Sequence, residues 1–226
     1  MKIIHQNAHY IVVCKAAGED AEHDVPERLA EALGGTPRMY YPVHRLDQAA
    51  SGLLVLARDR DTAAGLSRLL AEGRLHKTYL CVVSGTPETP GGTMKDLLYK
   101  DRMKKKMYPV KRKRNGVKEA ELSYTVLNTV DRASLVEVTL RTGRFHQIRC
   151  QFAARKMPLF GDGKYGSRQH CPHLALFCNT LSFYDEAEKQ ECHFEVKPPE
   201  EYPWTLFQAT SENGRETSRN DGMLRT

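Results

Sequence analysis

One stretch decides the fold of this chain: His44-Arg45-Leu46-Asp47-Gln48-Ala49-Ala50-Ser51-Gly52-Leu53-Leu54-Val55-Leu56-Ala57. Its apolar end predicts a buried strand, so that Asp47 lies in the loop leading into a rigid element. The Arg-x-Asp spacing lets both side chains face the same cleft. There Arg45 can hold a phosphate or fill a gap in a nucleic acid while the carboxylate of Asp47 takes part in chemistry. An Asp two residues after an Arg is, by itself, usually part of a solvated turn, so the prediction depends on the whole stretch.

The whole stretch resembles the signature of the RluA-type RNA pseudouridine synthases, in which His-Arg-Leu-Asp carries the catalytic aspartate. Ala50 stands where that family commonly has Thr, which removes a hydroxyl but leaves the carboxylate in place. Lys15 and Gly18 match a second family element, a strand followed by Lys-Pro-x-Gly, although its Pro is missing here. A third element is matched by Leu140-Arg141-Thr142-Gly143-Arg144-Phe145-His146-Gln147-Ile148-Arg149.

The predicted fold class is α+β with a largely antiparallel sheet, because strands dominate and no regular β-α-β alternation is present. The resemblance implies the pseudouridine-synthase fold, a long mixed, mainly antiparallel sheet with flanking helices and a central catalytic cleft. We expect a catalytic domain over residues 1–208 and no S4-like module, since the first strand of that domain begins near residue 3. Residues 209–226 are polar and lack a periodic apolar face, which predicts a disordered tail.

The resemblance implies three catalytic residues, Asp47, Tyr79 and Arg149. In that family the terminal Arg of the third element forms an ion pair with the catalytic Asp. An opposite charge within ~4–6 Å lowers a carboxylate pKa by about 1–3 units, and we expect this to keep Asp47 ionised despite burial. The alternative for Arg149 is a solvated charge on an amphipathic helix. Whether Asp47 adds to the ribose, adds to the base or only removes a proton stays open.

Tyr79 follows Lys77-Thr78, and the family places a Tyr here against the target uracil. A phenol with an ordinary pKa near ~10 is a poor base at neutral pH, so stacking is favoured over proton removal. A Tyr in a strand is otherwise most often a packing residue.

Four further residues are expected to bind substrate: Arg45, His44, Leu140 and Lys77. A uracil inside folded RNA must be flipped out of its stack, which costs a few kcal/mol. As the resemblance suggests, Arg45 would occupy the vacated space or hold a flanking phosphate, with a planar guanidinium that stacks and hydrogen-bonds at once. His44 would contact the RNA backbone, and Leu140 would pack against the base.

Hydrophobic periodicity and turn signals locate the other elements. A helix is predicted to begin at Asp59 or Asp61 and to end before Gly73, and a shorter one is compatible with residues 27–33, after Pro26 as a breaker. A further helix follows Arg141. Strands are predicted at residues 9–14, 77–85, 122–126, 136–140, 174–183 and 192–196, and a final docking turn at residues 204–207.

Positive charge is concentrated between Lys100 and Lys118, which we call the cationic segment. It holds ten basic residues against one acid, Asp101, for a net charge of +9, which leaves −3 for the rest of a chain whose total is +6. The segment fits a surface that follows RNA phosphates. A solvated flexible loop would have the same composition.

The 226 residues suffice for one good core, and 40% of them are hydrophobic. No apolar run is long enough to cross a membrane, and no export signal opens the chain, which favours a cytoplasmic protein. The six cysteines include no Cys-x-x-Cys pair, and His170, Cys171, His173 and Cys178 are spaced more loosely than tetrahedral ligands. We expect a monomer with no metal and no cofactor.

The predicted function is an RNA pseudouridine synthase that isomerises specific uridines in structured ribosomal or transfer RNA, with RNA as its partner. One alternative is a non-catalytic RNA-binding protein on the same scaffold. Another is a hydrolase with Asp47 as general base, which lacks a second convincing carboxylate. Asp162, in the glycine-rich loop 161–166, is predicted to be a turn residue.

Overall fold

The apolar run after Asp47 forms β4 (Ser51–Ala57), an inner strand of an 11-stranded sheet. The computed structural model describes residues 1–208, and the tail predicted for residues 209–226 lies outside the described residues. Successive residues of β4 point to opposite faces of the sheet. Leu53 and Val55 join one apolar cluster, and Leu54 and Leu56 join another. Both faces of this strand are therefore covered, as its uninterrupted apolar sequence predicts.

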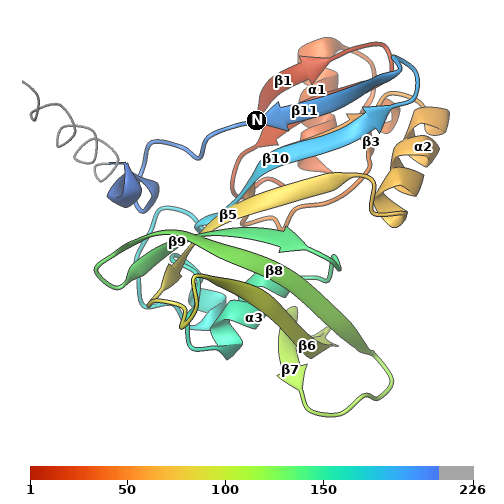
Figure 1. Cartoon of the computed structure of the whole chain (residues 1–226). Helices are drawn as coiled ribbons and strands as arrows, with labels where there is room; N and C mark the ends of the chain where they lie inside the picture. The colour runs from red at the N-terminus through yellow and green to blue at the C-terminus, as the bar shows by residue number, and fades with distance from the viewer. Residues whose placement is uncertain (209–226) are drawn as a thin grey trace, which may run out of the picture.

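The sheet runs through both halves of the molecule, and β5 crosses between them (Figure 1). Two short strands lie off the main path, where β11 (Gln190–Glu195) pairs with β10 and β3 (Tyr41–Pro42) pairs with β4. The strand order is β1 (Lys2–Gln6), β2 (Tyr10–Lys15), β4, β10 (Leu176–Asp185), β5 (His76–Ser84), β9 (Ala133–Leu140), β8 (Val117–Val130), β6 (Gly91–Asp101) and β7 (Lys106–Val110).

The parallel pairing of β4 with β10 explains the Ser-Gly turn after Asp47. Ser51 lies opposite Phe177, and Gly52 lies opposite Cys178. A Cβ atom at Gly52 would collide with the backbone of Cys178, and the φ angle of +113° also excludes most side chains. The glycine therefore lets the strand that carries the Asp47 loop join the centre of the sheet.

The helices lie on opposite faces of the sheet. Helix α1 (Asp24–Leu33) packs Val25 and Leu29 on the face that holds Leu54 and Leu56. Helices α2 (Arg60–Ala71) and α3 (Gln147–Ala154) pack on the other face, together with Tyr79. Short 3-10 helices are formed by Pro37–Met39, Gly163–Tyr165 and Trp204–Phe207.

Most predicted elements are confirmed, and one boundary is corrected. Helix α1 begins at Asp24 rather than after Pro26, because a proline in the first turn lacks only an N–H that has no helical partner. Strands β6 and β7, at residues 91–101 and 106–110, were not predicted from the sequence. Charged residues separate the few apolar ones on these strands, so the two-residue period is hard to recognise. Within residues 1–208, no helix combines the length and apolar character needed to span a membrane.

Candidate active site

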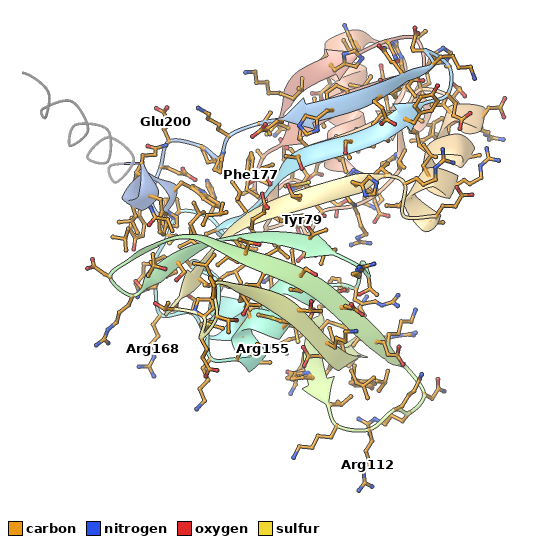
Figure 2. The ribbon with its side chains drawn as sticks, viewed as in Figure 1. Tyr79, Arg112, Arg155, Arg168, Phe177 and Glu200 are labelled. Carbon is orange, nitrogen blue, oxygen red and sulfur yellow. The ribbon has the colours of Figure 1, made fainter. Side chains whose placement is uncertain are left out.

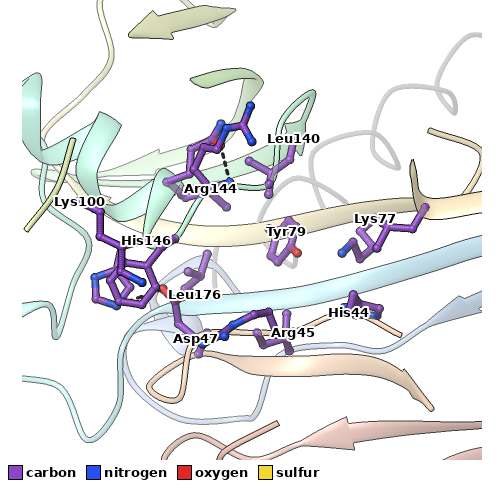
Figure 3. Close-up of a pocket in the computed structure, with 17 residues that line it drawn as sticks. His44, Arg45, Asp47, Lys77, Tyr79, Lys100, Leu140, Arg144, His146 and Leu176 are labelled. Carbon is purple, nitrogen blue, oxygen red and sulfur yellow. Dashed lines mark hydrogen bonds and ion pairs between the residues drawn. The ribbon is translucent and has the colours of Figure 1, made fainter. Parts of the chain in front are cut away.

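A cleft of about 460 Å³ opens between the Asp47 loop, β5, the end of β9 and the start of α3 (Figure 3). It lies on the face of the sheet that carries α2 and α3. Six of the seven predicted site residues line it, namely His44, Arg45, Asp47, Lys77, Tyr79 and Leu140. The seventh, Arg149, is buried on α3 and reaches Asp47 from outside the cleft lining.

Arg149 stands between two carboxylates. Its Nε and Nη2 atoms donate to Asp162 Oδ2 and Oδ1 at 2.7 and 2.8 Å, a bidentate pair. Its Nη1 atom is 3.4 Å from Asp47 Oδ2. The ion pair predicted between Arg149 and Asp47 is therefore present. It is the longer of the two, because Asp162 takes the two parallel donors of the guanidinium.

Burial and Arg149 act on the pKa of Asp47 in opposite directions. Burial raises the pKa of the Asp47 carboxyl, and the charge and hydrogen bond of Arg149 offset only part of that rise. The lowering expected from Arg149 is therefore present, but burial has the larger effect and the net direction is upward. That Asp47 is ionised when it reacts stays a prediction.

The prediction for Asp162 is corrected as well, because Asp162 is the main ion-pair partner of Arg149 and not only a turn residue. Its side chain is only 1% exposed. The glycine-rich loop wraps around it, since the backbone N–H groups of Tyr165 and Ser167 both donate to its carbonyl oxygen. The sequence Gly161-Asp162-Gly163 is equally typical of a solvated turn, so it carried no signal for this contact.

Lys15, at the end of β2, holds the Asp47 loop in place through hydrogen bonds. Lys15 is completely buried, and its Nζ donates to the carbonyls of Ala16, Glu19 and Gln48 at 2.8, 2.9 and 3.2 Å. Burial lowers the pKa of Lys15 to about 8. Gly18 donates its N–H to the same Gln48 carbonyl at 2.8 Å. The Lys-x-x-Gly element thus fixes the residue that follows Asp47, without the proline common in the family.

Position 50 closes the same loop through its backbone. The N–H of Ala50 donates to the carbonyl of Asp47 at 2.9 Å, and its side chain is buried against the cleft. The turn after Asp47 is therefore closed without the hydroxyl of the usual Thr.

Tyr79 and Lys77 project from the same side of β5 into the cleft (Figure 3). Burial raises the pKa of the Tyr79 phenol well above its usual value, and Cys178 and Asp47 add to that rise. The phenol is therefore protonated at neutral pH. A protonated phenol cannot act as a base, which agrees with stacking rather than proton removal as the role expected for Tyr79. Burial lowers the pKa of Lys77.

His44 and Arg45 have opposite environments. His44 is buried, its Nε2 accepts the Val55 N–H at 3.4 Å, and burial lowers its pKa well below the usual value. A neutral imidazole cannot offer an RNA phosphate the charge of a cation. Arg45 is 59% exposed and forms an ion pair of 3.1 Å with Glu22 at the edge of the cleft.

Two further residues of the site, His146 and Tyr165, were not predicted from the sequence. The imidazole Nε2 of His146 lies 3.9 Å from Asp47 Oδ2, and its Nδ1 lies 3.2 Å from the Tyr165 hydroxyl. His146 belongs to the quoted third element, and Tyr165 belongs to the loop of Asp162. Among residues 1–208, no three His, Cys, Asp or Glu side chains are placed to hold a metal ion.

Comparison with known proteins agrees with this geometry. A family described as RNA pseudouridylate synthase matches residues 4–154. A ribosomal large subunit pseudouridine synthase D of Zymomonas mobilis is 31% identical over 201 residues, which cover 83% of this chain and 62% of that protein. A tRNA pseudouridine synthase C of Vibrio parahaemolyticus is 27% identical over 190 residues, 75% of each chain.

The fold has a solved counterpart as well. Human RNA Pseudouridylate Synthase Domain Containing 1 superposes with a TM-score of 0.76 at 22% identity, over 88% of this chain and 83% of that one. This likeness concerns the fold. The family match covers the Asp47, Tyr79 and Arg149 elements alike, and the chain therefore belongs to the RNA pseudouridylate synthase family, in its RluA-type branch.

Proposed function

We propose that this protein is an RNA pseudouridine synthase that isomerises specific uridines in structured ribosomal or transfer RNA. The observation that carries the proposal is the half-buried carboxylate of Asp47 facing the cleft, with Arg149 at 3.4 Å and the Tyr79 ring in the same cleft. Simple RNA binding has no use for a carboxylate that faces a phosphate-rich partner. The relatives named above act on ribosomal RNA and transfer RNA according to their names.

The chemistry needs only these protein groups. The bond between N1 of uracil and C1′ of ribose breaks, the base turns, and a bond between C5 and C1′ forms. The proton lost from C5 is balanced by the one that N1 gains, so the reaction requires no second substrate. Asp47 serves as nucleophile toward the ribose or the base, or as the base that removes a proton. A cleft shielded from water protects the detached uracil during its rotation.

The other cleft residues hold the flipped nucleotide in this proposal. The Tyr79 ring stacks on the uracil, and Leu140, at the end of β9, packs against it. Arg45 leaves Glu22 and fills the gap in the RNA or holds a flanking phosphate, because an exposed ion pair of this kind is easily exchanged. Lys77 faces the same space from β5. His44 supports the loop and contributes a neutral surface.

The cationic segment supplies the phosphate-binding surface. It forms the end of β6, all of β7 and the connection to β8, and Arg112 projects from its far tip into solvent (Figure 2). Lys100 lines the cleft itself. The segment therefore places positive side chains both at the far tip and in the lining of the cleft.

Reversal of four charges in this segment should weaken RNA binding and flatten its salt dependence. The slope of log affinity against log salt should fall by about 0.7–0.9 for each phosphate that the variant no longer binds. The four residues are exposed, and their side chains form no ion pair with another described residue that would confuse the result: Lys104, Lys105, Lys111 and Arg112, each changed to Glu.

The matched control reverses four exposed lysines outside the segment, with the same change in net charge: Lys2, Lys156, Lys189 and Lys197. Binding of a structured RNA is measured over a range of salt. Equal slopes for the two quadruple variants would mean that the cationic segment does not contact RNA.

The rate of pseudouridine formation should fall in acid at a pH above the ordinary aspartate range. Asp47 reacts as a carboxylate in each of the three roles, and burial raises its pKa. Protonation as the pH drops through that raised value therefore removes the active form. The measurement is the single-turnover rate against pH. An acid limb at the ordinary value of about 3.9 would mean that another group controls the rate.

The decisive test of the function is a map of pseudouridines. Unmodified total RNA is incubated with the wild-type protein or with an Asp47→Asn variant, and pseudouridines are located by carbodiimide treatment and primer extension. Stops produced only by the wild type would establish the isomerase and name its uridine. Tight RNA binding without a new stop on any RNA would establish an RNA-binding protein instead.

A further inference from the structure

His146 occupies an unusual backbone position beside Asp47. It is the residue before α3, with φ and ψ angles of 48° and 29°, in the left-handed region that non-glycine residues rarely adopt. Strain of this kind persists only where the surroundings enforce it, and it is concentrated at functional sites. The conformation points both the imidazole and the backbone N–H of His146 toward the Asp47 carboxylate.

The hydrogen bonds of Tyr165 determine which imidazole nitrogen carries the proton. The backbone N–H of Met107, on β7, donates to the Tyr165 hydroxyl at 2.8 Å. The same hydroxyl lies 3.2 Å from Nδ1 of His146. The Met107 N–H occupies an acceptor position of the hydroxyl, and within residues 1–208 Nδ1 of His146 is the one acceptor placed to take the hydroxyl proton, so the geometry favours donation from Tyr165 to Nδ1. The single proton of a neutral imidazole then sits on Nε2, the nitrogen that faces Asp47.

The imidazole is neutral at every pH at which the enzyme would work. Burial, followed by the charges of Arg149, Lys164, Lys100 and Arg45, lowers the pKa of His146 to about 3. His146 therefore presents an uncharged ring to the Asp47 carboxylate, with Nε2 3.9 Å from Oδ2, and is not a titrating acid.

The cationic segment holds both rings in place. Phe145 stacks on His146 with centroids 3.8 Å apart, and Lys100 Nζ lies 4.3 Å above the Phe145 ring. Lys106 Nζ lies 4.9 Å from the centre of the Tyr165 ring. Together with the Met107 amide, residues of both β6 and β7 thus contact the groups that face Asp47.

We infer that His146 and Tyr165 are positioning residues for Asp47, in which the Tyr165 hydroxyl directs the Nε2–H of His146 toward Asp47 Oδ2. This inference rests on the proposed function. Arg149 Nη1 also approaches Asp47 Oδ2, at 3.4 Å. With both side-chain donors on Oδ2, the other oxygen, Oδ1, is the one presented to the flipped nucleotide.

The first test measures the tautomer in the free protein and needs no RNA. Nitrogen-15 NMR of the histidine rings should show His146 as the Nε2–H form, identified by loss of its signals in His146→Asn. His44 is the internal control, because its Nε2 accepts the Val55 N–H and its proton must lie on Nδ1. In Tyr165→Phe the Nε2–H form should no longer be enforced. An Nδ1–H form of His146 in the wild type would overturn the inference whatever the enzyme catalyses.

The second test separates positioning from binding and from folding. Tyr165→Phe and His146→Asn, the latter keeping a residue that tolerates the left-handed region, should each lower the single-turnover rate about 100-fold, as expected for a misplaced reacting group. RNA affinity should be unchanged. The double variant should be no slower than the slower single one, because both act through one contact.

Tyr124→Phe is the matched control, since it removes a hydroxyl bonded at 3.0 Å to Thr89 outside the cleft. Its rate should equal that of the wild type. Multiplicative losses in the double variant, or losses that follow the melting temperature across all three substitutions, would overturn the inference. A wild-type protein that forms no pseudouridine on any RNA would refute the proposed function, while the NMR result would still decide the tautomer.

Discussion

Asp47→Asn should lower the rate of pseudouridine formation by at least about 10⁴-fold, the scale seen when a reacting side chain is removed from an enzyme. The amide keeps the size of the carboxyl but can neither attack carbon nor accept a proton at neutral pH. RNA affinity should be retained, because the cationic segment and the cleft walls are unchanged.

The same variant should be at least as stable to unfolding as the wild type. The pKa of Asp47 is raised in the folded protein by burial. The folded state therefore binds a proton more tightly than the unfolded chain, and stability is lost as the pH rises from the ordinary aspartate pKa through the raised one. Above the raised pKa that cost is fully present, and the neutral amide removes it. Arg149 is not left unpaired, because Asp162 holds it at 2.7 and 2.8 Å.

The measurements are single-turnover rates and denaturant unfolding at neutral pH. Asp96→Asn is the control, since it alters a carboxylate that pairs with Arg155 outside the cleft. Near-normal turnover in Asp47→Asn would remove Asp47 from the chemistry. A large loss of stability would instead mean that its main contribution is to the fold.

Much of the fold could be predicted because its signals are local. The apolar run of β4 needs no partner to be recognised, and the helix predicted from Asp59 begins as expected, with the Asp59 side chain accepting the Thr62 N–H at 2.8 Å. The two-residue period also predicted the strands at residues 122–126 and 136–140, which lie in β8 and β9. β6 and β7 were missed because only isolated residues, such as Leu98 and Met107, are buried along them.

The only site residues that could be predicted are those that belong to a recognisable sequence motif. Asp47, Tyr79 and Arg149 belong to three separated elements, and the sheet order brings them to one cleft. The partnership of Arg149 with Asp162 depends on a distant contact instead. Phe160 donates its N–H to the carbonyl of Val82 on β5, and the loop that follows this contact has Asp162 and Tyr165 buried while Gly163, Lys164 and Gly166 are exposed. Nothing in a Gly-Asp-Gly sequence distinguishes a buried acid from a solvated turn.

Asp162→Asn should destabilise the fold by about 3 kcal/mol, the lower end of the cost of breaking a buried ion pair, because Asp47 still faces the Arg149 charge. The side chain is 1% exposed and receives two charged hydrogen bonds, so no water replaces the lost carboxylate. Asp96→Asn, whose partner Arg155 is one-third exposed, should cost less. Denaturant unfolding measures both, and equal stability of Asp162→Asn and the wild type would return Asp162 to a simple turn residue.

The fall in the rate of pseudouridine formation at acid pH provides a second test of the Asp162→Asn variant. This test depends on the charge near Asp47 and not on the stability of the fold. With Asp162 neutral, the whole charge of Arg149 acts on Asp47, so the pKa of Asp47 should fall and the acid limb should move to lower pH. The double variant Arg149→Gln, Asp162→Asn should recover stability, because two neutral amides replace a buried ion pair of similar volume. Its acid limb should move to higher pH, since burial still raises the pKa of Asp47 and no cation at position 149 opposes it. Shifts in the same direction for both variants would mean that Arg149 does not divide its charge between the two carboxylates.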